Sequence, residues 1–300
     1  MHQDHGAVAP RRDTVDRLRL HAADRGAPIA PLGVYGLAGA DFPADVRQLE
    51  HGLAAEALAR EDIVLNDTFI ALRAGTSRRW GVALICGQGI NACAVAPDGR
   101  SARFDGVGDI SGDWGGAGDV ANAGLAAAVR GRDGRGPRTS LERMVPAHFG
   151  LKTPEALVRA LYFERIPHRR LSELSRVVFA AATDGDEVAR GIVDRLADEL
   201  AGMAAALIRR LRLARLAPDI VLAGGVFRTS DDAFHGRLAG NIKAVAPDAR
   251  LIRLAAPPVL GAALIGLDRL VLGAGGGVDP GGAPEAAEAA VRAALEAWHR

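Results

Sequence analysis

Three apolar runs along this 300-residue chain end in glycines or in a carboxylate. The first run ends at Asp67, the second leads into Gly87, Gln88 and Gly89, and the third ends at residues 112–116 (GDWGG). Buried strands of α/β proteins read as continuous hydrophobic stretches, and their carboxyl ends present polar groups at the rim of a cleft. The pattern therefore predicts an α/β protein whose strand ends together form one active site.

The periodicity of the apolar residues predicts where strands and helices lie. Strands are expected over residues 32–37, 62–65, 80–86, 90–96, 100–104, 219–223 and 251–254. Helices are expected over residues 13–25, from 43 onward, 141–149, 154–162, 171–181, 187–213, through 234–238, 258–272 and 285–298. The strands between 80 and 104 form an antiparallel meander, and the later alternation of strand and helix indicates a further α/β unit.

Length and pattern divide the chain into two α/β domains. An N-terminal domain is expected over residues 1–110, and a C-terminal domain with a helical insertion over residues 111–273. The helix at 187–213 carries its apolar residues on a single stripe and forms the backbone of the second domain. A Gly/Pro linker and an Ala-rich, loosely attached tail helix are expected over residues 274–300.

The composition argues against several classes of function. The 37 basic and 36 acidic residues are scattered, whereas nucleic-acid-binding proteins concentrate positive charge on one face. No apolar run approaches the roughly 18 residues that a membrane-spanning helix requires. The first residues do not form a secretion signal, and Cys86 and Cys93 are too few for a disulfide framework. We therefore expect a cytoplasmic protein that binds neither nucleic acid nor membrane.

No side chain is expected to bind a metal ion. His2, His5 and His148 lack thiol or carboxylate companions, and the cysteine spacing fits no zinc or iron–sulfur pattern. The phosphate loop of P-loop NTPases, the dinucleotide fingerprint of Rossmann dehydrogenases and the nucleophile motif of α/β-hydrolases are absent as well. These three enzyme classes are therefore disfavoured.

Asp67 stands where a predicted strand gives way to a predicted helix. An Asp at such a position commonly caps the helix by accepting hydrogen bonds from backbone N–H groups, here near Ile70. A general base at the rim of a cleft would occupy the same place. Spacing alone favours the cap over the base.

The two glycine turns have both a structural and a functional interpretation. Gly87, Gln88 and Gly89 form either a plain hairpin turn or a nest of backbone amides that binds phosphate. Gly224 and Gly225 either permit a tight turn or allow a flat ligand to approach the end of the strand. Spacing does not choose between these interpretations.

A further candidate is Asp113, which stands among glycines. The glycines leave its carboxylate accessible as an acceptor for a ligand hydroxyl, whereas an Asx-turn is the structural alternative. The next residue, Trp114, suits a platform on which a sugar ring stacks, although a tryptophan is more often a core or hinge filler.

Taken in order, these segments resemble the N-acetylglucosamine kinases of the BadF/BadG/BcrA/BcrD group, within the actin-like sugar kinase superfamily. The resemblance runs from about residue 33 to residue 268. It is carried by residues 36–41 (GLAGAD), 66–67 (ND), 87–91 (GQGIN), 112–116 (GDWGG), 131–139 (GRDGRGPRT), 221–227 (VLAGGVF) and 258–263 (PVLGAA). Several motifs in the correct order are far more specific than any one of them.

The resemblance implies an actin-like (ribonuclease H-like) ATPase fold, in which two α/β domains flank a cleft. It also implies a kinase that uses ATP and Mg²⁺ to phosphorylate the 6-hydroxyl of N-acetylglucosamine or of a related hexose. Asp67 would then be the catalytic base, which reverses the preference from spacing. The partner would be a small-molecule sugar, and a homodimer is one option for the assembly.

The resemblance also implies two sets of binding residues. The residues expected to bind the sugar are Asn66, Asn91, Gly112 and Asp113. The residues expected to bind ATP are Gly87, Gln88 and Gly89 at the phosphates and Gly224 and Gly225 at the adenosine.

The sequence departs from the family pattern in three places. Gln88 stands in a hairpin that usually reads Gly-Thr-Gly, and Trp114 and Gly116 replace the acid and the hydroxyl of Gly-Asp-Glu-Gly-Ser. The Asp-Gly-Gly phosphate loop with which the family opens is not found, and residues 2–3 resemble the end of a sugar-contacting Asn-His segment. We therefore expect a chain shortened at its N-terminus, with the first strands of the N-terminal domain missing.

Two other functions are alternatives. One is a catalytically inactive sugar-binding or regulatory remnant, which would bind sugar without turning over ATP. The other is an ATPase activator of a radical dehydratase, as in relatives of the same group. That function requires cysteines that hold an iron–sulfur cluster between subunits, whereas Cys86 and Cys93 lie on a predicted hairpin, so it is disfavoured.

Overall fold

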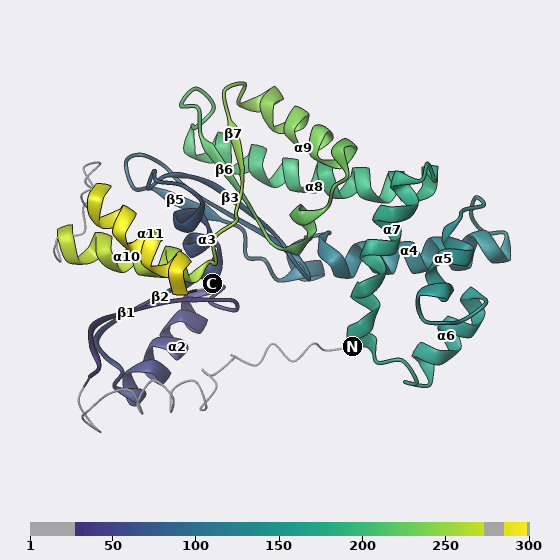
Figure 1. Ribbon diagram of the computed structural model, residues 1–300, viewed down its shortest axis with the longest axis horizontal. Coiled ribbons are helices and arrows are strands. Elements are labelled where there is room, and N and C mark those ends of the chain that lie inside the picture. Colours follow the sequence, from purple (N-terminus) through teal and green to yellow (C-terminus); the bar gives the residue numbers. More distant parts are fainter. Residues whose placement is uncertain (1–27, 273–284, 299–300) are drawn as a thin grey trace.

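The computed structural model describes residues 28–272 and 285–298 (Figure 1). In Figure 1 the first two strands lie at the lower left, a larger sheet occupies the centre, and a group of helices extends to the right. The helix predicted over residues 13–25, the histidines at positions 2 and 5, and the Gly/Pro linker lie outside the described residues.

A two-stranded parallel sheet comes first among the described residues. β1 (Ala30–Leu37) and β2 (Ala59–Asn66) pair in parallel, and α2 (Pro43–Glu56) connects them. Proline suits the first turn of a helix because its φ is fixed near the helical value and its missing N–H is not needed there. α2 buries Leu49 and Leu53. The predicted order of strand, helix and strand is confirmed.

The second sheet has five strands in the order β5-β4-β3-β6-β7. β3 (Gly81–Cys86), β4 (Ile90–Val95) and β5 (Ser101–Arg103) form the predicted antiparallel meander. β6 (Asp219–Ala223) and β7 (Arg250–Arg253) continue the sheet in parallel with β3. β6 is buried along its whole length because both faces of the sheet are covered there, which explains its mostly apolar sequence. Ile220 and Leu222 pack into the main core on one face, and Val221 packs with Leu72 of α3 on the other.

This sheet joins segments from both sides of the predicted domain boundary. Residues 81–103 share it with residues 219–253, although the boundary is predicted near residue 110. α9 (Asp232–Val245) connects β6 to β7. The division of the chain into domains at residue 110 stays a prediction, and the five-stranded sheet extends across it.

Five helices follow the meander. They are α4 (Gly116–Asp133), α5 (Leu141–His148), α6 (Pro154–Tyr162), α7 (Leu174–Thr183) and α8 (Glu187–Leu211). α8 buries most of its predicted stripe in the core that also covers one face of the five-stranded sheet. Apolar periodicity does not delimit α4, because that helix consists largely of alanine and glycine.

α3 (Asp67–Gly75) lies between the two sheets. It packs against α10 (Val259–Leu272) on one side and against β3, β4 and β6 on another. Glycines permit this close packing: added Cβ atoms on Gly36 and Gly261 would lie 2.5 Å and 1.8 Å from atoms of Ile70 in α3. The helix that begins at the proposed base is therefore held by both sheets.

α11 (Glu285–Trp298) packs onto α10. Val291 and Leu295 contact a small apolar cluster that contains Leu260 and Leu264. The expectation of a loosely attached tail helix is therefore wrong, because an apolar stripe and the ion pairs described below fix α11 to the rest of the chain.

Candidate functional site

The carboxyl ends of β3 and β6 lie side by side. These strands are parallel neighbours, and Ile85 pairs with Ala223 just before each strand ends. Gly224 follows with a φ of 113°, and a Cβ atom there would lie 2.2 Å from the carbonyl oxygen of Cys86. An added Cβ on Gly225 would meet nothing within 4 Å. Backbone packing therefore requires Gly224, whereas Gly225 borders open space.

The turn between β3 and β4 also seats the start of α4. The carbonyl oxygens of Gly87 and Gln88 accept hydrogen bonds from the N–H groups of Ala117 (2.8 Å) and Gly118 (2.9 Å). Added Cβ atoms on Gly87 or Gly89 would meet nothing within 4 Å. The turn is thus a structural hairpin with one backbone surface open, and its predicted role in binding phosphate stays a prediction.

The glycines after Asp113 bring that residue to the same turn. Gly116 has a φ of 82°, and an added Cβ there would lie 2.5 Å from the Cα of Gly89. An added Cβ on Gly115 would lie 2.8 Å from a side-chain carbon of Ile90 in β4. Side chains at these two positions would displace the start of α4 from the sheet.

Asp113 itself is held by local hydrogen bonds. Its N–H donates to the carbonyl oxygen of Gly108 (3.1 Å), and its carboxylate accepts from the hydroxyl of Ser111. Gly112 precedes it with a φ of 77°, in the left-handed region that favours glycine. The Asx-turn alternative does not match, because the N–H of Gly115, which would donate to Asp113 in such a turn, donates to Asp119 instead (2.8 Å). The half-buried carboxylate as a sugar ligand stays a prediction.

Asn91 lies on β4 and points at the loop that leads to Asp113. An added Cβ on Gly106 would lie 2.2 Å from the Nδ2 atom of Asn91, and the Oδ1 atom of Asn91 accepts from the N–H of Ala92 (2.7 Å). Asn91 and Cys93 share one face of β4 because they are two residues apart. The structure therefore brings Asn91, the Asp113 loop and both glycine turns to one end of the five-stranded sheet.

Asn66, rather than Asp67, caps α3. Its Oδ1 atom accepts hydrogen bonds from the N–H (3.1 Å) and the hydroxyl (2.7 Å) of Thr68. Its Nδ2 atom donates to Asp41 (2.9 Å), in the loop after β1. The cap interpretation of Asp67 is therefore wrong, because the preceding residue, with extended φ and ψ, already fills that position. A role for Asn66 in binding sugar stays a prediction.

The carboxylate of Asp67 is consequently not the N-cap of α3. Burial raises the pKa of its carboxyl above the usual value, while backbone hydrogen bonding at Thr68 and the positive charge of Arg103 lower it. Burial outweighs the effects that lower the pKa. A half-buried carboxylate with a raised pKa is a better proton acceptor than an exposed one, as a general base requires.

Arg103 is the residue near Asp67 that the sequence did not single out. It lies on β5, and its Nη1 atom is 3.8 Å from the Oδ1 atom of Asp41. The same guanidinium donates to the carbonyl oxygens of Phe104 (2.8 Å) and Ala40 (3.5 Å). Arg103 thus connects the edge of the second sheet with the loop after β1. A lone arginine in a three-residue strand gives no signal of this role in the sequence.

Trp114 is partly buried against the main core cluster. The guanidinium of Arg195 lies 3.8 Å from the centroid of its ring, so that face of the indole is covered. The interpretation of Trp114 as a packing residue is favoured over a sugar-stacking platform.

A cavity of about 680 Å³ lies at the other end of α4. Arg132, Ser140, Arg143, Lys152 and Thr153 are among the residues that line it, and none of the predicted site residues does. Backbone N–H groups at the amino ends of α5 and α8, which border this cavity, already have an acceptor: Asp186 accepts from Ser140 (2.6 Å) and from Ala189 (2.9 Å). We therefore interpret the cavity as a gap between packed helices and not as a binding site.

Two absences apply to the described part of the chain. Within residues 28–272 and 285–298, no group of three or more His, Cys, Asp or Glu side chains could hold a metal ion. Over the same ranges, no helix is both long and apolar enough to cross a membrane.

Residues 13–266 match the BadF/BadG/BcrA/BcrD ATPase family. The chain belongs to this family. An N-acetylmuramic acid/N-acetylglucosamine kinase of Clostridium acetobutylicum is 33% identical over 191 residues, which are 64% of this chain and 62% of that protein. An N-acetyl-D-glucosamine kinase of Dictyostelium discoideum is 28% identical over 209 residues, 68% of this chain and 64% of that protein. The chain thus spans less than two thirds of the length of either relative.

Solved structures show the fold of this BadF/BadG/BcrA/BcrD family member. A candidate N-acetylglucosamine kinase from Chromobacterium violaceum superposes with a TM-score of 0.64 at 20% identity, covering 87% of this chain and 85% of that one. A second candidate N-acetylglucosamine kinase, from Porphyromonas gingivalis, gives a TM-score of 0.53 at 22% identity, covering 77% and 75%. The predicted actin-like α/β ATPase fold is confirmed.

Proposed function

We propose that this chain belongs to an ATP-dependent kinase that phosphorylates the 6-hydroxyl of N-acetylglucosamine or of a related hexose. The observation that carries the proposal is Asp67: a half-buried carboxylate of raised pKa, at the carboxyl end of a strand, in a member of an ATPase family. The kinases of Clostridium and Dictyostelium support the choice of an amino sugar as substrate.

The proposed reaction needs one proton acceptor. The carboxylate of Asp67 takes the proton from the sugar hydroxyl as its oxygen attacks the γ-phosphorus of ATP. The bond between that phosphorus and the β,γ-bridging oxygen breaks, and ADP leaves with the electron pair. Little covalent chemistry is left to the protein, so the rate depends on positioning and on neutralisation of charge.

The glycine turns fit a nucleotide. Added Cβ atoms at positions 87, 89 and 225 would meet open space, so a large polar ligand has room beside these residues. The N–H of Gly87 already donates to the carbonyl oxygen of Gly89 (3.0 Å), which fixes the shape of the turn. Gly87, Gln88 and Gly89 would bind the phosphates, and Gly224 and Gly225 would lie against the adenosine. Mg²⁺ binds largely through phosphate oxygens and water, so it enters with ATP and needs no cage of three protein ligands.

The sugar would bind between Asp67 and the start of β4. Asn91 and Asp113 offer an amide and a carboxylate that suit hydroxyl or acetamido groups, with the backbone of Gly112 beside them. Both side chains also make local hydrogen bonds, which fix their orientation before the sugar arrives. A cytoplasmic location and a homodimer remain predictions.

A panel of hexoses and amino sugars, including N-acetylglucosamine and N-acetylmuramic acid, tests the proposal in an assay that couples ADP release to NADH oxidation. We expect ADP release that depends on an amino sugar and on Mg²⁺. Calorimetric titration of the same sugars separates binding from turnover. Sugar binding without ADP release from any member of the panel would instead support the inactive sugar-binding remnant.

A further inference from the structure

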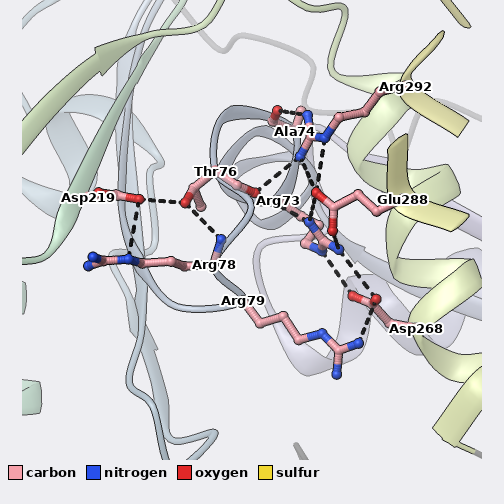
Figure 2. Close-up of polar contacts among 9 residues, drawn as sticks. All are labelled: Arg73, Ala74, Thr76, Arg78, Arg79, Asp219, Asp268, Glu288 and Arg292. Atoms are coloured by element: carbon pink, nitrogen blue, oxygen red, sulfur yellow. Dashed lines mark hydrogen bonds and ion pairs between the residues drawn. The ribbon is translucent and has the colours of Figure 1, made fainter. Parts of the chain in front are cut away.

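The carboxyl end of α3 is enclosed by an ion network drawn from three helices (Figure 2). Arg73 of α3 is only 5% exposed. Its Nε atom donates to Asp268 of α10 (2.9 Å), and its Nη2 atom donates to Glu288 of α11 (2.6 Å). Arg79 donates to Asp268 as well (2.8 Å). Each charge of this buried cluster therefore has an opposite charge within hydrogen-bonding distance.

Arg292 of α11 caps the carboxyl end of α3. It donates to the carbonyl oxygens of Ala74 (2.9 Å) and Thr76 (3.2 Å), and also to Glu288 (2.7 Å). The last carbonyl groups of a helix have no partner within the helix, and a cation there also opposes the negative end of the helix dipole. Arg73 of α3 itself donates to the carbonyl oxygen of Thr76 (3.3 Å), and helix α11 adds the remaining capping contacts.

The next residues fix the same end of α3 to the second sheet. The hydroxyl of Thr76 donates to Asp219 of β6 (2.5 Å), and Arg78 donates to the carbonyl oxygen of Ala217 (2.8 Å). Figure 2 shows the contact between Thr76 and Asp219 on one side of the helix end and the contacts of Arg73 on the other. The carboxyl end of α3 is therefore held from both sides.

Asp67 is the first residue of the same helix. α3 has nine residues, so its two ends are separated by about 12 Å at a rise of about 1.5 Å per residue. A helix this short moves as a rigid rod, and a shift or rotation at Arg73 is carried to Asp67. The position of the carboxylate therefore depends on contacts at the far end of the helix.

We propose that Glu288 and Arg292 are positioning residues for Asp67, so that α11 sets the geometry of proton transfer without touching the substrate. The inference rests on the proposed kinase function. Asn91 and Asp113, two of the proposed sugar ligands, lie on β4 and on the loop after β5, away from the network. Asn66, the other side chain predicted to bind sugar, caps α3 and is anchored separately by Asp41 (2.9 Å). Loss of the α11 contacts should therefore lower kcat while sugar affinity changes little.

The test compares Glu288→Ala and Arg292→Ala with Asp231→Asn in the 300-residue chain. Asp231 forms a similarly buried ion pair with Arg190 between α8 and α9, so its variant controls for the loss of stability alone. We expect kcat to fall on the order of 10- to 100-fold in Glu288→Ala, as small misplacements of reacting groups cost this much. Arg292→Ala, whose side chain is 27% exposed, should fold and show a smaller loss of kcat.

Sugar affinity, measured by calorimetry, should stay within about twofold of the wild type in all three variants, since none removes a sugar ligand. Unchanged kcat in both α11 variants, or an equal loss in Asp231→Asn, would overturn the inference. A wild-type chain that binds sugar and releases no ADP would overturn the kinase function instead.

A double-mutant cycle between Asp67→Asn and Glu288→Ala, followed by urea unfolding, tests the link without any catalytic activity. Distant sites normally contribute to stability independently. We expect the two changes to be non-additive, because release of the far end of α3 lets the carboxylate at position 67 reach solvent. Additive effects would show that α11 does not influence position 67.

Discussion

The two ends of α3 differ in how completely their buried charges are paired. At its carboxyl end, burial alone would lower the pKa of Arg73, but the hydrogen bonds that Arg73 donates to Glu288 and Asp268 more than offset that effect, so its pKa is raised. At its amino end, Asp67 is raised in pKa by burial that its neighbours do not offset. One buried charge is fully paired and stabilises the fold, and the other is held incompletely paired. Such incomplete pairing is typical of groups that react.

The paired end should show the largest effect on stability. Arg73→Ala removes one of the two cationic partners of each of the buried carboxylates Asp268 and Glu288, and we expect a loss of about 3–5 kcal/mol in the free energy of unfolding. Urea unfolding followed by circular dichroism measures this loss. Arg100→Ala, in an exposed pair with Asp98, is the control and should leave the unfolding midpoint unchanged. Similar midpoints for the two variants would refute the claim that the Arg73 network stabilises the fold.

The two glycines after β6 show a similar contrast, because Gly224 is closely packed and Gly225 borders open space. Gly224→Ala places a Cβ against the carbonyl oxygen of Cys86 in a left-handed conformation, and we expect a loss of about 1–3 kcal/mol in unfolding free energy. Gly225→Ala meets open space, so stability should be kept and affinity for ATP reduced. Thermal unfolding of the two variants measures their stability, and nucleotide titration measures their affinity for ATP. Equal destabilisation would mean that Gly225 is a packing residue too.

Removal of the charge of Asp67, at the amino end of α3, should stabilise the folded chain. The folded pKa of Asp67 lies above the usual value of 3.8, so its ionised form is disfavoured in the folded state. This penalty is absent below about pH 3.8, where the group is protonated in both states, and grows as the pH rises through the folded pKa. Asp67→Asn should therefore stabilise the chain at pH 7 but not at pH 3.5, as urea unfolding at both values would show. A loss of stability at pH 7 would mean that the carboxylate serves the fold.

The smallest effect concerns Cys93, which lies beside Thr68 at the amino end of α3. Burial raises the pKa of its thiol to about 12, and burial does the same for Cys86. Both thiols should resist alkylation at pH 8 in the folded chain and react in urea. Mass spectrometry after iodoacetamide treatment measures this, and rapid labelling of Cys93 in the native state would show that the space next to Asp67 is open to solvent.

Much of the fold could be predicted from local pattern. Continuous apolar runs located β3 and β6, the glycine turns separated the strands of the meander, and the apolar stripe located α8. The sheet order could not be predicted, because β3 and β6 are far apart in the sequence and only tertiary packing makes them neighbours. α4 could not be delimited, since its alanines and glycines carry little apolar periodicity.

The candidate site was predictable where its residues end strands and unpredictable where its residues come from elsewhere. The turn after β3, Asp113 and the glycines after β6 do meet at one end of the sheet. The sequence pattern places the cap of α3 one residue too late, because Asn66 and Asp67 are both good capping residues and only backbone geometry separates them. The partners of Arg73 lie 195 and 215 residues away along the chain, so no sequence window contains them.

The central claim is that the incompletely paired carboxylate of Asp67 is the base of a sugar kinase. Steady-state ADP release and calorimetric sugar binding, measured side by side for the wild type and Asp67→Asn, test it most directly. We predict that kcat falls roughly 100- to 10,000-fold while the Kd for the sugar changes little, because a positioned base contributes about that much to rate. Turnover retained in Asp67→Asn, in a chain that binds the sugar normally, would contradict the account.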